Sequence, residues 1–390
     1  MFDYAIIVIG YNRLNSIKRL MNSLDGCYYD TNIDLIISID KGDHQELERY
    51  VNDFKWKFGK KIVKLHKKRL GLKEHVLTCG NYLNEFNYDA IAVFEDDIYV
   101  AKDFFRYMRN TVEFYHTDTR IAGISLYKHE WNINANRPFV PLKTKDDVYF
   151  MQYAQSWGQV WMKDQWNEFY QWFKKNEHHL IMDYQVPVNI TEWSEKSWLK
   201  YHIMYCIYTN KYFVYPHISL TTNFSDIGSH VTSNSSRMQV EILYGDKKEY
   251  NLCELNSQSV RYDAFFEPQF ISKYLGIKDT ELTIDLYGTK SDRVMSKYLL
   301  TSKSMGYSII RKFGCHFRPH EANIINDFTG EIFYLYDQTN AITKSPKDNL
   351  LTYRYAYDGR NTNYLNRYFI KYFFQVLVMK IKNKLNKLSG

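Results

Sequence analysis

The sequence predicts an α/β fold with flanking helices, followed by a smaller C-terminal region of α+β or helical character. Two observations support this prediction. Short apolar runs recur that are typical of strands buried on both faces, and segments with helical spacing separate them. The 390 residues are 45% hydrophobic, which is enough to fill at least one large core. We therefore expect a packed globular chain built around a sheet.

The predicted elements follow one another at short intervals. A β-branched run from Ala5 to Ile9 stops at Gly10, and the segment from Ser16 to Leu24 has the spacing of an amphipathic helix. The same alternation then continues along the chain. We expect strands at 5–9, 33–39, 61–65, 90–94 and 121–126, and helices at 16–24, 44–58, 73–83 and 101–115. Helices between strands predict a sheet with helices packed against it.

The alternation is lost near residue 240, where we place a domain boundary. We expect a first domain at 1–240, a second at 241–362 whose role no motif indicates, and a basic amphipathic tail helix at 363–390. The tail has no apolar stretch of the about 20 residues needed to cross a bilayer. Its basic and apolar residues suit an anionic membrane surface, and the alternative is a helix docked on the protein's own core.

The cysteines indicate the cellular compartment of the protein, and the charges exclude one class of partner. Lys and Arg number 51 against 44 Asp and Glu, and a net charge of +7 is too mild for a dedicated nucleic-acid binder. The five cysteines form no C-x-x-C pair, which indicates a reducing compartment. The N-terminus lacks the pattern of a signal peptide. We expect a cytoplasmic protein, held at the inner membrane face if the tail binds there, with no nucleic-acid partner.

An acidic triplet follows the predicted strand at 90–94. Glu95, Asp96 and Asp97 come directly after this strand, and Asp40 directly follows the predicted strand at 33–39. Ligands of open α/β sheets bind outside the carboxyl ends of the strands. Carboxylates there can hold a divalent cation that neutralises a diphosphate. The alternative is a solvated turn or a helix cap.

The residues around this triplet resemble a known family. The segment 93–105, which reads VFEDDIYVAKDFF, resembles the metal-binding segment of the N-acetylglucosaminyltransferase I family, where E-D-D precedes A-P-D-F-F. Tyr11-Asn12-Arg13 and Ser38-Ile39-Asp40 are similar to its D-R and S-Q-D motifs, in the same order. Bacterial capsule and surface-polysaccharide transferases of glycosyltransferase family 2 share this layout. The resemblance covers about residues 4–232 and implies a GT-A fold, a Rossmann-like mixed sheet with flanking helices.

The resemblance also implies an activity. It implies metal-dependent, inverting transfer of a hexosyl or N-acetylhexosaminyl group from a nucleotide diphosphate, most simply a UDP-sugar, to a glycan or lipid-linked acceptor in polysaccharide biosynthesis. Asp97 would bind Mn²⁺ or Mg²⁺, and Glu95 and Asp96 would contact the ribose or the donor sugar. Arg13 and Asp40 would hold the nucleobase, consistent with their donor and acceptor groups. The alternatives are a surface charge for Arg13 and a turn cap for Asp40.

Four further residues are weaker candidates. Lys73 follows a basic run before a helix and is suited to a diphosphate. Trp157 and Gly158 resemble the family's G-x-G-W segment, where glycine lets the backbone approach the donor sugar. His230 resembles the histidine of its glycine-serine-histidine loop, which would contact phosphate or metal. The alternatives are a solvated face, a core tryptophan and a structural histidine.

Inverting transfer needs a carboxylate that takes the proton of the acceptor hydroxyl. The family places it in a W-D-D-W stretch, and the corresponding residues here run from Glu192 to Trp198. We assign Glu195 as the base, with Glu192 and Asp183 as reserves, against the alternative of a surface acid.

Two other functions remain open. A sugar-phosphate nucleotidyltransferase uses a similar sheet but needs a glycine-rich opening loop, and Gly10 is the single glycine there. The other is a membrane-associated module that binds a nucleotide without turnover.

Overall fold

The computed structural model describes residues 2–178, 183–224, 226, 238–247, 249–292 and 296–348, with six positions of the tail, 374, 377, 378, 380, 381 and 384. The chain divides into two compact units, Met1–Ser296 and Lys297–Gly390. Each is described by itself below.

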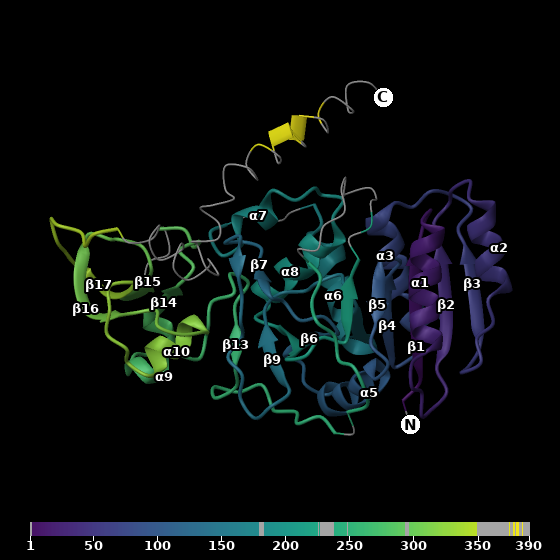
Figure 1. Ribbon diagram of the computed structural model, residues 1–390, viewed down its shortest axis with the longest axis horizontal. Helices are drawn as coiled ribbons and strands as arrows, with labels where there is room; N and C mark the ends of the chain where they lie inside the picture. The colour runs from purple at the N-terminus through teal and green to yellow at the C-terminus, as the bar shows by residue number, and fades with distance from the viewer. Residues whose placement is uncertain are drawn as a thin grey trace. The chain divides into compact units, whose positions relative to one another are not determined.

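A mixed sheet forms the centre of the first unit (Figure 1). Within the described residues it has nine strands in the order β13-β9-β11-β6-β10-β4-β1-β2-β3. The strands are β1 (Tyr4–Gly10), β2 (Asp34–Ile39), β3 (Lys61–Leu65), β4 (Ala90–Glu95), β6 (Ile121–Ser125), β9 (Val148–Met151), β10 (Gln159–Met162), β11 (Tyr212–Pro216) and β13 (Arg261–Tyr262). Strands β3, β2, β1 and β4 are parallel, whereas β10 runs antiparallel between β4 and β6.

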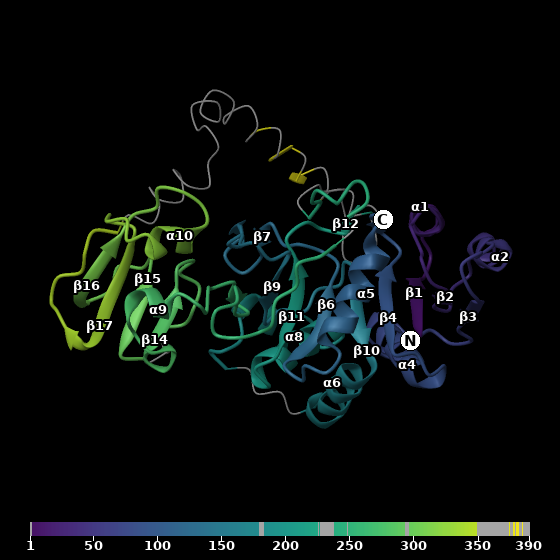
Figure 2. The ribbon, with the colours of Figure 1, turned by 90° about the horizontal axis from the view of Figure 1, so that it is seen from below.

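Helices cover both faces of this sheet because its central strands are apolar on both sides. The helices of the first unit are α1 (Leu14–Asp25), α2 (Gln45–Asp53), α3 (Leu72–Gly80), α4 (Tyr82–Glu85), α5 (Phe104–Tyr115), α6 (Lys163–Asn176), α7 (Val188–Thr191), α8 (Trp198–Tyr208), α9 (Ser272–Leu275) and the 3₁₀ turn η1 (Asp279–Glu281). Alternate strand residues such as Ile6 and Leu35 share one core with α1, α2 and α5. Helices α3 and α6 both contact α8. Figure 2 shows α1 and α6 on opposite sides of the sheet.

The predicted α/β architecture is confirmed, and five predicted strands match β1, β2, β3, β4 and β6. Two predicted helices differ in extent. Helix α2 ends at Asp53 because Phe54 leaves the helical conformation, and the indole of Trp56 donates to the Ile33 carbonyl at 2.8 Å. The helix predicted at 73–83 is two helices, α3 and α4, which meet at Asn81.

Shorter strands lie outside the large sheet. These are β5 (Ile98–Val100), which pairs with β12 (Thr221–Asn223), β7 (Trp131–Asn132), which pairs with β8 (Arg137–Pro138), and β14 (Leu282–Asp285). Strand β5 of this β5–β12 ribbon begins directly after Asp97 in the chain. It therefore brings residues beyond position 220 beside the end of β4.

The first unit extends past the boundary near residue 240 that the sequence indicates. Strand β13 pairs with β9 at the edge of the large sheet, and Phe266 and Phe270 are buried. Residues 241–296 therefore belong to the compact unit that contains the acidic triplet. The separate roles predicted for 1–240 and 241–362 stay predictions.

The second unit contains a small antiparallel sheet in which β17 (Phe333–Ala341) pairs with both β15 (Tyr298–Thr301) and β16 (Tyr307–Phe313). Helix α10 (His320–Ile325) lies between β16 and β17 in the chain, so this part has the predicted α+β character. The described tail positions are helical. Among the described residues, the structure contains no helix that is both long enough and apolar enough to span a bilayer.

Candidate functional site

The register of three parallel strands brings the predicted acidic residues to one edge. Gly10 of β1 is paired with Ile39 of β2, and Ile9 of β1 is paired with Glu95 of β4. The residues that follow these strands therefore leave the sheet side by side. Asp40 and the acidic triplet lie at this edge, where open α/β sheets bind ligands.

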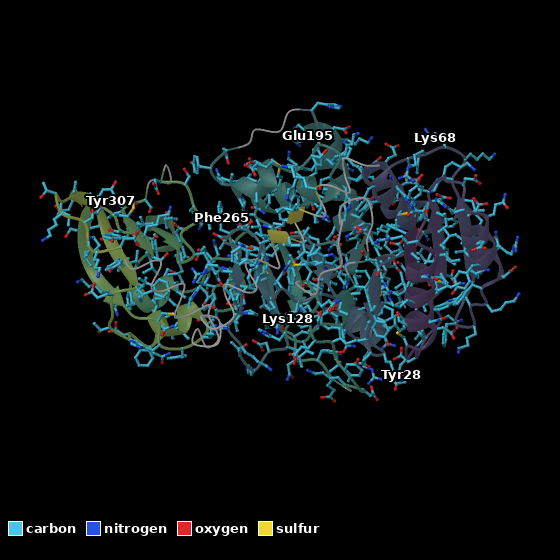
Figure 3. The ribbon with its side chains drawn as sticks, turned by 45° about the horizontal axis from the view of Figure 1, so that its top comes forward. Tyr28, Lys68, Lys128, Glu195, Phe265 and Tyr307 are labelled. Atoms are coloured by element: carbon cyan, nitrogen blue, oxygen red, sulfur yellow. The ribbon has the colours of Figure 1, made fainter. Side chains whose placement is uncertain are left out.

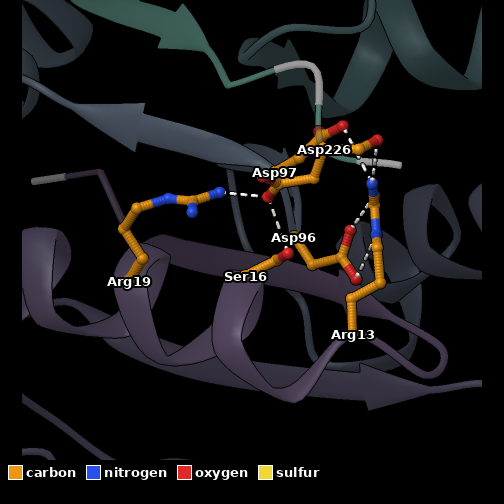
Figure 4. Close-up of polar contacts among 6 residues, drawn as sticks. All are labelled: Arg13, Ser16, Arg19, Asp96, Asp97 and Asp226. Atoms are coloured by element: carbon orange, nitrogen blue, oxygen red, sulfur yellow. Dashed lines mark hydrogen bonds and ion pairs between the residues drawn. The ribbon is translucent and has the colours of Figure 1, made fainter. Parts of the chain in front are cut away.

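Arg13 joins the two aspartates of the triplet. It precedes α1, and its Nε lies 3.3 Å from Oδ2 of Asp96 while its Nη2 donates to Oδ1 of the same carboxylate. Its Nη1 lies 3.2 Å from Oδ2 of Asp97. Asp96 and Asp97 are 5% and 8% exposed, so the guanidinium neutralises carboxylates that are largely removed from water (Figure 4).

Asp226 reaches the same place through the β5–β12 ribbon. The amide of Phe224, which follows β12, donates to the Asp97 carbonyl at 2.9 Å. Arg13 then donates to the backbone oxygen of Asp226 at 3.3 Å. The Asp226 carboxylate accepts from Ser16 at 2.7 Å and from Arg19. Burial opposes ionisation of Asp226, but these two donors lower its pKa below the ordinary value.

Sequence reasoning missed Ser16, Arg19 and Asp226. A signal was present, because positions 13, 16 and 19 are spaced to share one face of a helix. Arg19 also lies over the ring of Phe224, with 3.7 Å between its guanidinium carbon and the ring centroid. Asp226 lies four residues before His230 in the sequence. His230 itself lies outside the described residues.

Burial changes the acidity of the triplet. It raises the pKa of Glu95 to about 8, with further contributions from Asp97 and Asp96 and an opposing one from Arg13. Burial also raises the pKa of Asp96 to about 6 against the pull of Arg13. Strongly perturbed acids that cluster at a sheet edge are typical of functional sites.

The acid pair fits a hard divalent cation. Oδ1 of Asp97 is buried and has no hydrogen-bond partner among the described residues. Such an oxygen is a suitable ligand for Mg²⁺ or Mn²⁺. The described residues contain no group of three or more His, Cys, Asp or Glu side chains arranged to hold a metal. An ion bound here would therefore take further ligands from water or from a phosphate, as Mg²⁺ commonly does.

Asp40 holds a neighbouring loop. Its carboxylate accepts from the amides of Lys41 and Leu70 at 2.8 Å and from that of Gly71 at 2.9 Å. Burial alone would raise the pKa of Asp40, but these backbone donors lower it. The loop so held carries Arg69, which stacks on Tyr11 at 3.3 Å from guanidinium carbon to ring centroid. Asp40 therefore positions a basic loop beside the end of β1.

Glu195 and Lys73 lie in a second cluster. Glu195 accepts from Lys200 at 2.8 Å and from the Tyr201 hydroxyl at 2.7 Å. These two bonds lower the pKa of Glu195. The Nζ of Lys73, in the first turn of α3, lies 5.2 Å from the centroid of the Tyr201 ring.

The two members of the Glu195–Lys200 pair differ in exposure. The Glu195 side chain is 64% exposed, whereas that of Lys200 is 1% exposed. Figure 3 shows Glu195 at the same border of the first unit as Lys68, which belongs to the loop held by Asp40. Solvent can therefore reach the carboxylate.

Trp157 and Gly158 are held by contacts within the fold. The Thr221 hydroxyl donates to the Trp157 carbonyl at 2.6 Å, and the indole packs on the Tyr127 ring at 4.8 Å. Gly158 has a φ of +99°, and a Cβ there would lie 2.8 Å from a methyl of Thr221. Glycine is therefore needed here for the left-handed conformation and for close packing on β12.

One described cavity lies away from these strand ends. It has a volume of about 680 Å³ and is lined by residues of α5 and of segments 145–146 and 250–252. None of the predicted site residues lines it. We place the candidate site at the ends of β1, β2 and β4, because the buried charges converge there.

Comparisons with known proteins find matches at low identity and low TM-score. No family model matches the chain. The structure of Staphylococcus aureus TarS 1–349 in complex with UDP-GlcNAc has a TM-score of 0.39 and 15% identity, over 59% of this chain and 61% of that one. The glycosyltransferase GlyE of Streptococcus pneumoniae TIGR4 has a TM-score of 0.31 and 9% identity, over 55% and 45%.

A third similar structure is the mannosyltransferase PcManGT of Pyrobaculum calidifontis in complex with GDP-Man and Mn²⁺. It has a TM-score of 0.29 and 11% identity, over 42% of this chain and 47% of that one. The match spans about three fifths of the TarS 1–349 structure, 61%, and less of the other two chains. Likeness at this level carries no argument about fold or function. The resemblance to the N-acetylglucosaminyltransferase I family stays a prediction.

Proposed function

We propose that this chain is a metal-dependent glycosyltransferase of the GT-A fold. It would move a sugar from a nucleotide diphosphate, most simply a UDP-sugar, to a glycan or lipid-linked acceptor. The observation that carries this proposal is the buried Asp96–Asp97 pair at the carboxyl end of β4, with Arg13 on its oxygens and one Asp97 oxygen free of described partners. Carboxylates in this place suit a cation that accompanies a diphosphate.

The proposed donor-binding roles are those that the family resemblance implies, and the placement of the acids at the strand ends supports them. Asp97 would bind Mn²⁺ or Mg²⁺, which supplies charge neutralisation for the diphosphate leaving group. Glu95 and Asp96 would contact the ribose or donor sugar.

The proposed nucleobase contacts come from neighbouring strand ends. Arg13 and Asp40 would hold the nucleobase, and the Asp40 carboxylate also orders the loop from Leu70 to Gly71. Lys73, Trp157, Gly158 and His230 remain proposed donor contacts. The local packing of Trp157 and Gly158 supports a role in shaping the site wall.

Glu195 is the proposed catalytic base of inverting transfer. Its exposed carboxylate has a lowered pKa and stays ionised at neutral pH, as proton acceptance requires. The same shift makes it a weaker base, so an acceptor hydroxyl would have to displace Lys200 or Tyr201. This predicts that acceptor binding rearranges the cluster.

The tail is the proposed membrane contact. Leu377, Val378 and Ile381 are exposed and share a helical spacing, and Lys380 and Lys384 lie on the same described segment. This combination suits an anionic lipid surface. A cytoplasmic protein held at the inner membrane face is therefore part of the proposal.

Donor hydrolysis tests the proposed function directly. Purified protein is incubated with a panel of UDP-, GDP- and other nucleotide sugars in Mn²⁺ or Mg²⁺, and the released nucleoside diphosphate is measured. We expect release from one donor, loss of release in excess EDTA, and loss in Asp97→Asn. Absence of release from every donor, or equal release with EDTA, would contradict the proposal.

A further inference from the structure

Arg13 contacts most of the carboxylate oxygens of Asp96 and Asp97. Its guanidinium takes Oδ1 and Oδ2 of Asp96 and Oδ2 of Asp97, three of the four carboxylate oxygens. Oδ1 of Asp97 is left buried and without a partner among the described residues. A divalent cation arriving here would find a single free carboxylate oxygen.

A guanidinium and a metal ion compete for these atoms. Mg²⁺ and Mn²⁺ bind carboxylate oxygens at short range and prefer about six oxygen ligands. A planar guanidinium with two arms on the same carboxylates repels such an ion and blocks its ligands. Coordination by both oxygens of Asp97 therefore requires Arg13 to move.

The surrounding residues hold the Arg13 side chain in place but do not enclose it fully. Its Nη1 also donates to the backbone oxygen of Asp226, whose carboxylate is anchored by Ser16 and Arg19. The Arg13 side chain is 23% exposed. It can therefore turn toward solvent, or toward an anion bound at the strand ends, without crossing the core.

We propose that Arg13 is an internal counter-ion that occupies Asp96 and the metal-binding carboxylate of Asp97 in the nucleotide-free protein. The inference rests on the proposed function in one respect, because the nucleotide that Arg13 would contact is what receives its side chain when the metal displaces it. Metal and nucleotide then bind cooperatively. The metal frees Arg13 to contact the nucleotide, and the nucleotide stabilises the displaced Arg13 side chain. Metal without nucleotide binds weakly.

Linkage makes the inference quantitative. If UDP raises the affinity for Mn²⁺, then Mn²⁺ raises the affinity for UDP by the same factor. Removal of the internal counter-ion should raise the affinity for Mn²⁺ alone. It should also reduce the factor by which UDP improves Mn²⁺ binding, because part of that factor is the displacement of Arg13.

The experiment is a Mn²⁺ titration of full-length protein without nucleotide, followed by the free-Mn²⁺ signal in electron paramagnetic resonance, and repeated with saturating UDP. We expect Arg13→Gln to bind Mn²⁺ alone about tenfold more tightly than wild type, within the usual range of coupling between sites. Arg13→Lys keeps the charge but loses the fork, so it should also bind more tightly than wild type.

Arg19→Gln is the matched control. This variant also loses one positive charge, but the guanidinium of Arg19 pairs with Asp226 and not with the acidic pair. Its affinity for Mn²⁺ should stay within about threefold of wild type, as expected for a screened charge without direct contact. Melting curves of all variants confirm that they are folded.

Two results would overturn the inference. One is an Arg13→Gln or Arg13→Lys protein that binds Mn²⁺ no more tightly than wild type. The other is an equal gain in Arg19→Gln, which would show a general charge effect. Failure of the proposed function gives a different pattern, in which UDP never changes Mn²⁺ binding while the variants still differ in Mn²⁺ affinity alone.

Discussion

The ring of His202 stacks on the ring of Phe169, with centroids 4.0 Å apart and planes 18° apart. His202 is fully buried on α8, and neither of its ring nitrogens has a hydrogen-bond partner among the described residues. Burial lowers the pKa of His202 to about 3. This histidine is therefore held neutral by an aromatic environment.

The first prediction concerns pH and His202→Phe. An unfolded histidine has a pKa of about 6.5, so below that pH the unfolded chain binds a proton that folded His202 excludes. Wild type thus loses stability through this group as pH falls. Relative to wild type, His202→Phe should gain about 2 kcal/mol between pH 7.5 and pH 5. Urea unfolding of both proteins at the two pH values measures this.

The variant must be compared with wild type because buried acids change the stability with pH in the opposite direction to a buried histidine. Glu95, with its raised pKa, adds stability as pH falls. The difference between the two proteins isolates His202. A pH-independent difference would show that the ring is protonated or solvated in the folded state.

The second prediction concerns Asp97→Ala. The side chain lies just beyond β4 and contributes a charge rather than core packing, so the protein should keep its melting temperature within a few degrees. Metal-dependent donor hydrolysis should fall by about 10² or more, because a metal ligand is lost. Full activity in this variant would remove Asp97 from the metal site.

The third prediction concerns Glu195→Gln. The amide keeps the shape but cannot take a proton, so kcat should fall by about 10²–10⁴ with little change in donor KM. The change also removes the charge partner of buried Lys200, which keeps the carbonyls of Thr191 and Trp193 as acceptors, so the cost should be about 1 kcal/mol of stability or less. A lowered melting temperature with unchanged kcat would leave Glu195 a purely structural role.

The fourth prediction concerns Gly80→Ala at the end of α3. A Cβ there would overlap the indole of Trp166, which is itself stacked on Trp161 at 4.3 Å. We expect a loss of about 1–3 kcal/mol in the free energy of unfolding. Gly26→Ala is the control, since its Cβ would meet nothing closer than 3.5 Å. Equal stability of the two variants would contradict this packing.

The fifth prediction concerns the tail. Deletion after about residue 362 should leave activity on a soluble acceptor analogue unchanged and weaken binding to anionic vesicles, by about 1 kcal/mol for each Lys or Arg near the surface. Sedimentation with phosphatidylserine vesicles at low and high salt measures this. Equal binding of intact and truncated protein excludes the membrane role, and early melting of the truncated form indicates a tail docked on the protein.

Parts of the fold and site that depend on local pattern could be predicted. The apolar runs of β1, β2 and β4 end just before Tyr11, Asp40 and Asp96, so their meeting at one edge follows from parallel pairing. The role of Asp226 could not be predicted, because it depends on β12 pairing with β5 across more than a hundred residues.

Other features depend on side-chain partners that spacing does not reveal. The sequence shows Glu195 as an acid between two tryptophans, but not that Lys200 and Tyr201 turn back to bind it. The end of the first unit was equally hidden, since β13 contributes only two residues to the sheet. Short edge strands have too few residues for a recognisable period.

The position of β10 has a consequence for synthesis on the ribosome. This strand lies between β4 and β6 and is the sole bridge between them in the large sheet described here, yet it leaves the ribosome well after both. Until Gln159–Met162 has emerged, the nascent chain presents a free edge of β4 and a β6 strand without neighbours, because β11, the other neighbour of β6, is made later still. Such edges are sites for pairing with other chains, so chaperones should be needed at least until β10 has emerged.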